Sequence, residues 1–249
     1  MSKRQERREQ RRKQQQRQRL WTIGMVVVGA VLVAFAFIWP SLRSNQATSD
    51  ALASITPIAP VAFTAAKDGT HLGDPNAPVK MDVWEDFQCS GCLHYSQNIE
   101  PSIIQKFVET GKVYYTFHFF LLIDGASTTG ESHQSANAAM CANEQSHFWD
   151  YHQILFANWL GENVGSYSDA RLVAMAQSIG LDMSAFKKCF KANTYADQIN
   201  KDFQDGQKMG VQATPAIFVN GQVAVSSAGA RYIPSIDDLS KMIEGFLGQ

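Results

Sequence analysis

The amino-acid sequence predicts an α/β domain on the C-terminal side of one transmembrane helix. Three observations support this: an uncharged apolar run near the N-terminus, a strand-like segment that leads directly into two cysteines, and a helical block with strand-like segments on both sides. The expected order in the domain is strand, helix, strand, helical block, strand, strand, helix. A chain of 249 residues suffices for one large domain or two small ones.

The apolar run covers residues 20–39 and contains no charged side chain. At about 1.5 Å per residue, a helix of this length spans the roughly 30 Å hydrocarbon core of a bilayer. Trp21 and Trp39 bracket it, as expected for indole rings at the two interfaces. We therefore predict an uncleaved transmembrane anchor over residues 20–40. The alternative is a secretory signal cleaved after Ala51-Leu52-Ala53, although the run is longer than the about 7 to 15 apolar residues of such signals.

A basic tail precedes the run, because residues 1–19 contain nine Lys or Arg and two Glu. Taken alone, such a tail would also suit nucleic-acid binding. Next to a membrane span, an excess of Lys and Arg indicates the cytoplasmic side. We therefore expect a single-pass protein of the cell membrane, with its N-terminus in the cytoplasm, its domain outside and no nucleic-acid partner.

Residues 41–72 are rich in Ser, Thr, Ala and Pro and show no sustained periodicity. We interpret them as a flexible linker between the anchor and a domain over residues 73–249. A coil of some thirty residues has an end-to-end distance of about 30 Å, so the domain would stay near the membrane surface.

The spacing of apolar residues predicts the first strand and the first helix of the domain. Val79, Met81 and Val83 alternate with charged residues, which predicts a short strand. After the cysteines, apolar residues recur every four positions from Tyr95 to Phe107, which predicts a helix that Pro101 should kink.

The middle of the chain combines a second strand with a long helical block. Residues 112–122 are dense in aromatic residues and Val, which favour a sheet. From about residue 130 to residue 209 the apolar spacing is helical and no strand pattern interrupts it.

The C-terminal part predicts a hairpin and a final helix. The segments AIFV and QVAV flank Asn220-Gly221, a pair typical of two-residue hairpin turns. Ser235 and Asp238 fit a capping box at the start of an amphipathic helix.

Cys89 and Cys92 are the candidate catalytic residues. At the start of a helix, cysteines three positions apart lie within disulfide range. The helix N-terminus stabilises a thiolate at Cys89, which would be the nucleophile, and Cys92 would resolve the mixed disulfide. Haem attachment would need His where the chain has Leu93. Zinc binding by four cysteines would need a second close pair, so we expect no metal site.

Cys141 and Cys189 both lie in the helical block. Cysteines in an oxidising compartment tend to pair, and these two remain after Cys89 and Cys92 are assigned. We expect a structural disulfide between two helices. The alternative is a second redox pair that relays electrons.

Three segments together resemble a known family: EDFQCSGC after a strand, AAMCANEQSHFWDYHQILF in the helical block, and GVQATPAIFVNG before the hairpin. They are similar to the DsbA-like thiol-disulfide oxidoreductases of the thioredoxin superfamily, in their membrane-anchored or secreted bacterial branch. The resemblance covers roughly residues 70–247. It implies a thioredoxin fold with an all-helical insertion, about residues 130–209, between core strands 2 and 3.

The resemblance also implies roles for two residue pairs. Thr214-Pro215 matches the family's cis-proline loop, which lies against the active-site cysteines and binds the substrate chain. Ser90-Gly91, between the cysteines, would help to set the redox potential. Several relatives bury an acid where this chain has Val83, and we expect the nearby Glu85 and Asp86 to be solvated loop carboxylates.

The expected activity is therefore thiol-disulfide exchange outside the cytoplasm. The enzyme would introduce disulfides into reduced or unfolded exported proteins, and the family suggests reoxidation by a quinone-coupled membrane oxidoreductase. No cofactor is expected, since no Gly-rich phosphate-binding loop is present. Two alternatives remain: a reductase or isomerase of the same fold, and a tethered peptide-binding module, similar to a chaperone, without catalysis.

Overall fold

The computed structural model describes residues 21, 24–26, 28–36, 47, 49–59, 63–125, 127–229 and 232–248. The chain divides into two compact units, Met1–Ala47 and Thr48–Gln249. The basic tail expected over residues 1–19 lies outside the described residues.

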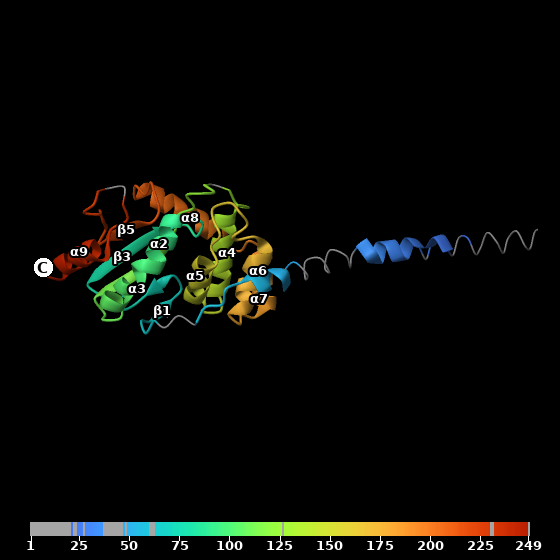
Figure 1. Ribbon diagram of the computed structural model, residues 1–249, viewed down its shortest axis with the longest axis horizontal. Coiled ribbons are helices and arrows are strands. Elements are labelled where there is room, and N and C mark those ends of the chain that lie inside the picture. The colour runs from blue at the N-terminus through green and yellow to red at the C-terminus, as the bar shows by residue number, and fades with distance from the viewer. Residues whose placement is uncertain are drawn as a thin grey trace, which may run out of the picture. The chain divides into compact units, whose positions relative to one another are not determined.

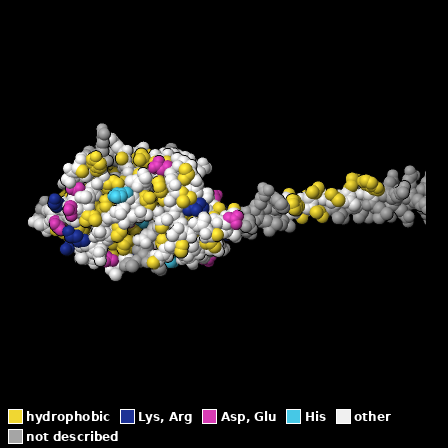
Figure 2. Space-filling view, viewed as in Figure 1, with side chains coloured by type: hydrophobic (Ala, Val, Ile, Leu, Met, Phe, Trp, Pro, Cys, Tyr) yellow, Lys and Arg dark blue, Asp and Glu magenta, His cyan; other side chains and the backbone are white. Residues whose placement is uncertain are grey.

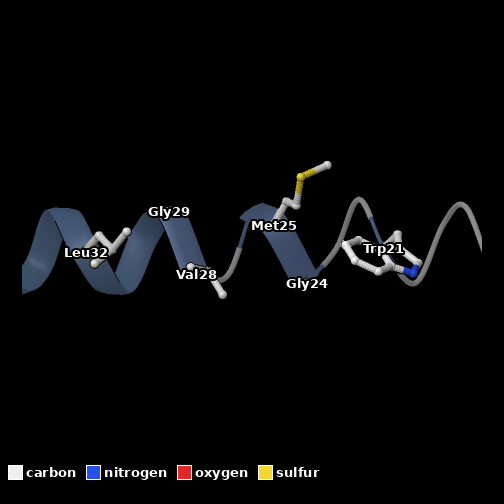
Figure 3. Close-up of a pocket in the computed structure, with 6 residues that line it drawn as sticks. All are labelled: Trp21, Gly24, Met25, Val28, Gly29 and Leu32. Carbon is white, nitrogen blue, oxygen red and sulfur yellow. The ribbon is translucent and has the colours of Figure 1, made fainter.

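The described residues of the first unit from position 21 to position 36 are helical. Their side chains are exposed and mostly apolar; for example, Trp21 is 74% and Leu32 63% exposed. Figure 3 shows Trp21, Met25, Val28 and Leu32 on successive turns of this helix. Among the residues that the structure describes, no helix is both long enough and apolar enough to cross a membrane. Part of the expected anchor over residues 20–40 lies outside the described residues.

The second unit is built on one mixed sheet with the strand order β1-β2-β4-β3-β5-β6. The strands are β1 (Lys67–Asp68), β2 (His71–Leu72), β3 (Val79–Glu85), β4 (Val113–Phe119), β5 (Ala216–Val219) and β6 (Gln222–Val223). β3 pairs in parallel with β4 and antiparallel with β5, so it is the central strand. Its apolar residues Val79, Met81 and Val83 are fully buried, in agreement with the alternation in the sequence.

The segment after β3 forms three helical pieces. These are α2 (Ser90–Asn98), α3 (Glu100–Ile103) and a π-helical turn, η1 (Ile104–Val108). The interruption at Ile99 precedes Pro101, which lacks the N–H that a continuous helix would use. The proline expected to kink the helix therefore lies directly after a break in it.

A helical block lies between β4 and β5. It consists of α4 (Glu131–Asn143), α5 (Phe148–Ala157), α6 (Asp169–Ser178), α7 (Met183–Lys191) and α8 (Ala196–Lys208). Figure 1 shows α4, α5, α6 and α7 gathered beside the sheet. Phe117 of β4 contacts Phe148 of α5 edge to face at 5.4 Å between ring centroids, so the block and the sheet share one core. The fold is the α/β fold with a helical insertion that the sequence predicts.

The C-terminal elements also follow the sequence pattern. Asn220 and Gly221 both have positive φ angles, 47° and 77°, as a tight hairpin turn between β5 and β6 requires. The final helix, α9 (Ile236–Leu247), begins with a capping box in which the side chains of Ser235 and Asp238 each accept from the other's backbone N–H.

The interpretation of residues 41–72 as one flexible linker is wrong for the C-terminal part of that range. Residues 49–54 are helical, and Ile55 is only 8% exposed in the core of the second unit. Asn158 binds the backbone of Thr56 through both its side-chain oxygen and its side-chain nitrogen. Further along, β1 and β2 form a hairpin at the edge of the sheet. Scattered apolar residues in a polar, small-residue segment were enough to attach it to the domain.

Candidate active site

The two central cysteines lie where the chain passes from β3 into α2. Cys89 is the N-cap residue of α2, and its backbone N–H donates to the carbonyl of Asp86, which closes a turn. Both thiols are free, but Cys89 is 8% exposed whereas Cys92, one turn along the helix, has no exposed surface. Only Cys89 is therefore open to another molecule.

The surroundings of the two thiols shift their pKa values in opposite directions. The Cys92 side chain contributes most to lowering the pKa of Cys89 to about 6. Burial opposes this shift, whereas the backbone N–H groups of Cys92 and Gly91 lower the pKa further. Burial is the main reason that the pKa of Cys92 lies well above its usual range, and the hydrogen bond between the Cys92 and Cys89 side chains raises it further. Near neutral pH, Cys89 is a thiolate and Cys92 a thiol.

Thr214 and Pro215 lie beside this pair. The peptide bond between them is cis, and the protonated Cys89 thiol donates to the Thr214 carbonyl oxygen at 3.3 Å. The structure therefore brings the predicted substrate-binding pair into contact with the candidate nucleophile, across 125 residues of sequence.

Of the two residues between the cysteines, Gly91 makes the closer approach to this loop. A Cβ atom at position 91 would lie 3.2 Å from the Thr214 carbonyl oxygen, 3.3 Å from Pro215 Cδ and 3.5 Å from Cys89 Sγ. The missing side chain lets the helix start and the proline loop touch. Ser90 is exposed at the first position of α2.

Gln88 is a site residue that the sequence reasoning missed. Its buried side-chain amide donates to Asp124 Oδ1 at 3.0 Å and to Ser132 Oγ at 2.9 Å. Its Oε1 accepts from the backbone N–H of Asn163 at 2.7 Å, and its backbone carbonyl accepts from Trp159 Nε1 at 2.8 Å. These bonds fix the turn before Cys89 to the helical block. A polar side chain directly before the cysteine was the only sequence signal.

Asp86 belongs to the same network and is buried, so its interpretation as a solvated loop carboxylate is wrong. One of its oxygens accepts from the backbone N–H of Gln88, and the other accepts from the backbone N–H of Ile123 and from Ser132 Oγ, each at 2.9 Å. Burial raises the pKa of Asp86 to about 6, although these three hydrogen bonds lower it.

Glu85 is also buried, with no exposed surface, and the same correction applies. It is the last residue of β3, and neither of its oxygens has a hydrogen-bond partner. Burial, followed by the nearby Glu100 carboxylate, raises the pKa of Glu85 well above its usual range, and the neighbouring Cys92 side chain lowers it. A protonatable acid thus lies next to the buried thiol.

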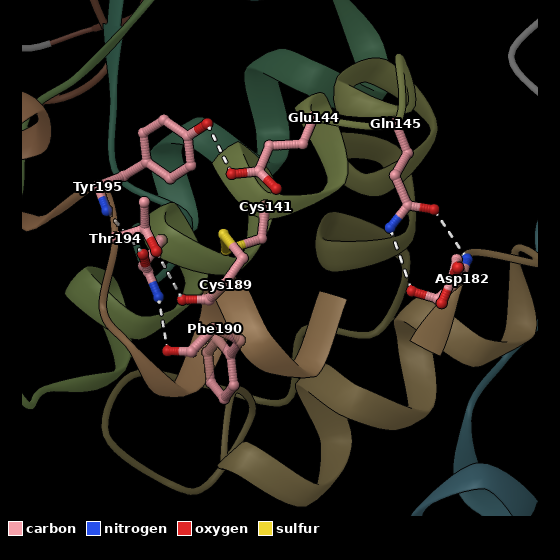
Figure 4. The surroundings of a disulfide bond; sticks show 9 residues. Cys141, Glu144, Gln145, Asp182, Cys189, Phe190, Thr194 and Tyr195 are labelled. Carbon is pink, nitrogen blue, oxygen red and sulfur yellow. Dashed lines mark hydrogen bonds between the residues drawn. A yellow bond between two sulfur atoms is a disulfide. The ribbon is translucent and has the colours of Figure 1, made fainter. Parts of the chain in front are cut away.

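Cys141 and Cys189 form a disulfide that joins α4 to α7, with their Cα atoms 5.8 Å apart. Figure 4 shows hydrogen bonds on either side of it: Tyr195 donates to Glu144, and Gln145 binds the backbone of Asp182. The bridge therefore lies within a bonded contact between helices of the insertion, as a structural disulfide would.

The sequence and the fold of this chain are similar to those of known proteins. Residues 65–244 match the family model described as Thioredoxin, and this region contains both central cysteines and the cis-proline loop. A "Probable disulfide bond formation protein D" from Bacillus cereus is 25% identical over 175 residues, which cover 70% of this chain and 76% of the relative. "Disulfide bond formation protein D" from Bacillus subtilis is 27% identical over 174 residues, with coverages of 70% and 74%.

A solved structure shows the same arrangement of elements. The crystal structure of oxidised BdbD from Bacillus subtilis superposes with a TM-score of 0.62 at 25% sequence identity. The match covers 78% of this chain and 99% of that one, so the helical insertion is included with the sheet.

Proposed function

Because the chain belongs to the thioredoxin family and is a DsbA-like thiol-disulfide oxidoreductase, we propose that it introduces disulfides into exported proteins through Cys89 and Cys92. The observation that carries this proposal is the difference between the two thiols. Cys89 keeps 8% of its surface exposed and has a lowered pKa, whereas Cys92 has no exposed surface and has a raised pKa.

The reaction begins with the Cys89–Cys92 disulfide. A substrate thiolate attacks Sγ of Cys89, the bond between the two enzyme sulfurs breaks, and Cys92 leaves and takes up a proton. A second substrate thiolate then attacks the substrate sulfur of the mixed disulfide, and Cys89 leaves as a thiolate. The substrate gains one disulfide, the enzyme becomes a dithiol, and two electrons have moved from substrate to enzyme.

The low pKa of Cys89 favours the oxidase direction. A thiolate that is stable at neutral pH is a good leaving group, and it stabilises the reduced enzyme relative to the disulfide. An enzyme whose dithiol form is stable readily oxidises the thiols of its substrate, because it gains stability when its own disulfide is reduced. A reductase such as thioredoxin, at about −270 mV, has the opposite balance.

Exposed apolar and uncharged side chains of the second unit suit contact with an unfolded polypeptide. The loop that binds Gln88 also exposes Leu160 and Val164, which are 60% and 61% exposed. On the face shown in Figure 2, many exposed side chains are uncharged, and Lys and Arg lie mainly at the end where Figure 1 places α9. The Thr214-Pro215 loop would hold the substrate backbone beside Cys89.

Anchoring and reoxidation belong to the same proposal. Residues 20–40 would span the cell membrane once, with residues 1–19 in the cytoplasm and the domain outside. A quinone-coupled membrane oxidoreductase would accept the two electrons from the dithiol and restore the disulfide. The uncharged run and the basic tail support this arrangement.

The test uses the oxidised full-length protein in detergent micelles and a reduced, unfolded protein that has two cysteines. Counting free thiols should show one substrate disulfide formed per enzyme molecule. Cys89→Ser should form none. Cys92→Ala, treated with a thiol-activating reagent and mixed with a variant of the substrate that has a single cysteine, should trap a mixed disulfide at Cys89, because neither Cys92 nor a second substrate thiol can resolve it. Oxidation of the substrate by Cys89→Ser at the wild-type rate would contradict the proposal. Binding of the substrate by the oxidised wild type without any loss of free thiols would favour a binding module.

The direction is tested separately by equilibration with glutathione. The proposal predicts a potential on the oxidising side, nearer to about −120 to −180 mV than to the about −270 mV of thioredoxin. A value near the thioredoxin end, without oxidation of the test protein, would favour a reductase.

A further inference from the structure

Three buried side chains that the exchange reaction does not use converge from different elements. Glu85 ends β3, Glu100 begins α3, and His152 lies in the middle of α5. One potential ligand atom from each, two carboxylate oxygens and one imidazole nitrogen, lies within 4.8 Å of the others. The exposed fractions are 0% for Glu85, 1% for Glu100 and 0% for His152.

The polar atoms of this cluster are incompletely paired. Glu100 accepts from Tyr115 OH at 2.9 Å and from Ser96 Oγ at 3.2 Å. Both carboxylate oxygens of Glu85 and both ring nitrogens of His152 have no hydrogen-bond partner. Buried polar groups are normally satisfied, because leaving one unpaired costs about 1–3 kcal/mol and more for a charged group.

The charges of the cluster point to a cation as the partner. Two carboxyl groups meet in the interior, and no ion pair with Lys or Arg involves either of them in the described part of the chain. A buried carboxyl group must be either protonated or paired, and a bound cation would take the place of the proton and use the free oxygens and nitrogen as ligands.

We propose that Glu85, Glu100 and His152 bind one divalent transition-metal ion, with Zn²⁺ as the best fit. Carboxylate oxygen and imidazole nitrogen are ligands that zinc accepts, and an imidazole in the set disfavours Ca²⁺ and Mg²⁺, which prefer oxygen ligands alone. Three protein ligands leave a coordination position open for water. The site lies next to Cys92, but none of its three ligands takes part in the exchange steps proposed above, so it stands whether or not the proposed direction is correct.

The test measures Zn²⁺ binding to the oxidised full-length protein in detergent micelles, by competition with a chromogenic chelator. Oxidation keeps Cys89 and Cys92 in a disulfide, so that thiolates cannot bind the metal. The wild type should bind one Zn²⁺ per chain. Glu100→Gln and His152→Asn should each weaken binding at least about 100-fold, because even loss of an outer-shell partner typically costs about 10- to 100-fold.

The matched control is His147→Gln. His147 also lies at α5 and pairs with a carboxylate, Asp150, at 2.8 Å, but it is partly exposed. This variant should bind Zn²⁺ as the wild type does. Loss of binding in His147→Gln but not in Glu100→Gln would overturn the proposal, as would the absence of stoichiometric binding in the wild type.

A second measurement uses the wild type alone, so it does not require any variant to fold. X-ray absorption of the zinc-loaded, oxidised wild type should show a shell of nitrogen and oxygen ligands with the scattering signature of one imidazole. A shell containing sulfur, two or more imidazoles, or oxygen alone would contradict the assignment.

Discussion

The Sγ atom of Cys89 lies 3.3 Å from the carbonyl oxygen of Thr214. The two residues belong to opposite ends of the domain sequence, and β3 and β5, which pair with each other, bring them together. A substrate chain that binds along the Thr214-Pro215 loop would therefore pass directly over the candidate nucleophile.

Gly91→Ala should slow exchange with a protein substrate by about tenfold, since small displacements of reacting groups are costly. The new methyl group would lie 3.2 Å from the Thr214 carbonyl oxygen, so the loop must move away from Cys89. Single-turnover oxidation of a reduced test protein measures the effect. Gly245→Ala is the control, because no atom lies within 4 Å of its Cβ position. Equal rates for both variants would show that the close approach is unimportant.

His118→Gln should reduce stability in a pH-dependent way. Burial, the largest influence, lowers the pKa of His118, but hydrogen bonds to Asp202 and Asp82 raise it to about 9. Because the folded pKa exceeds the unfolded value of about 6.5, the contribution is complete below about pH 6.5 and disappears as the pH rises through about 9.

Urea unfolding of wild type and His118→Gln at several pH values measures this effect. The difference in unfolding free energy should be about 2 kcal/mol at pH 6 and should shrink towards pH 9.5. A difference that stays constant with pH would mean that the imidazole is not charged in the folded protein.

Replacing both Cys141 and Cys189 by Ala should lower the unfolding free energy by about 4 kcal/mol. The disulfide closes a loop with a sequence separation of 48, and the loss of that constraint increases the entropy of the unfolded chain. The exchange rate of the folded variant should be unchanged. Loss of exchange with normal stability would instead support the alternative of a second redox pair.

The fold could be predicted largely because local signals agree with the tertiary structure. The alternation in β3, the break before Pro101 and the Asn220-Gly221 turn each act over a few residues, and each appears where expected. The cis peptide bond before Pro215 was different, since only the resemblance to a family indicated it. Nothing in the residues themselves requires it.

The buried polar residues behind the two cysteines could not be predicted in the same way. Glu85 and Asp86 resemble loop carboxylates in the sequence, but residues distant in the sequence surround them, such as Glu100 beside Glu85 and Ser132 beside Asp86. Glu100 and His152 sit among apolar and aromatic residues at helical spacing, so the pattern indicates core without distinguishing its polar members. Their convergence depends on how three elements pack, and the sequence does not encode that locally.

The most direct test of the account is to measure the pKa of the Cys89 thiol in the reduced full-length protein. The rate at which Cys89 is alkylated, recorded as a function of pH, gives this pKa. The account predicts a midpoint near pH 6. In Cys92→Ala the midpoint should move upward, because the Cys92 side chain is the main cause of the lowered pKa. A wild-type midpoint near the about 8.5 of an ordinary cysteine, unchanged in the variant, would contradict the central claim.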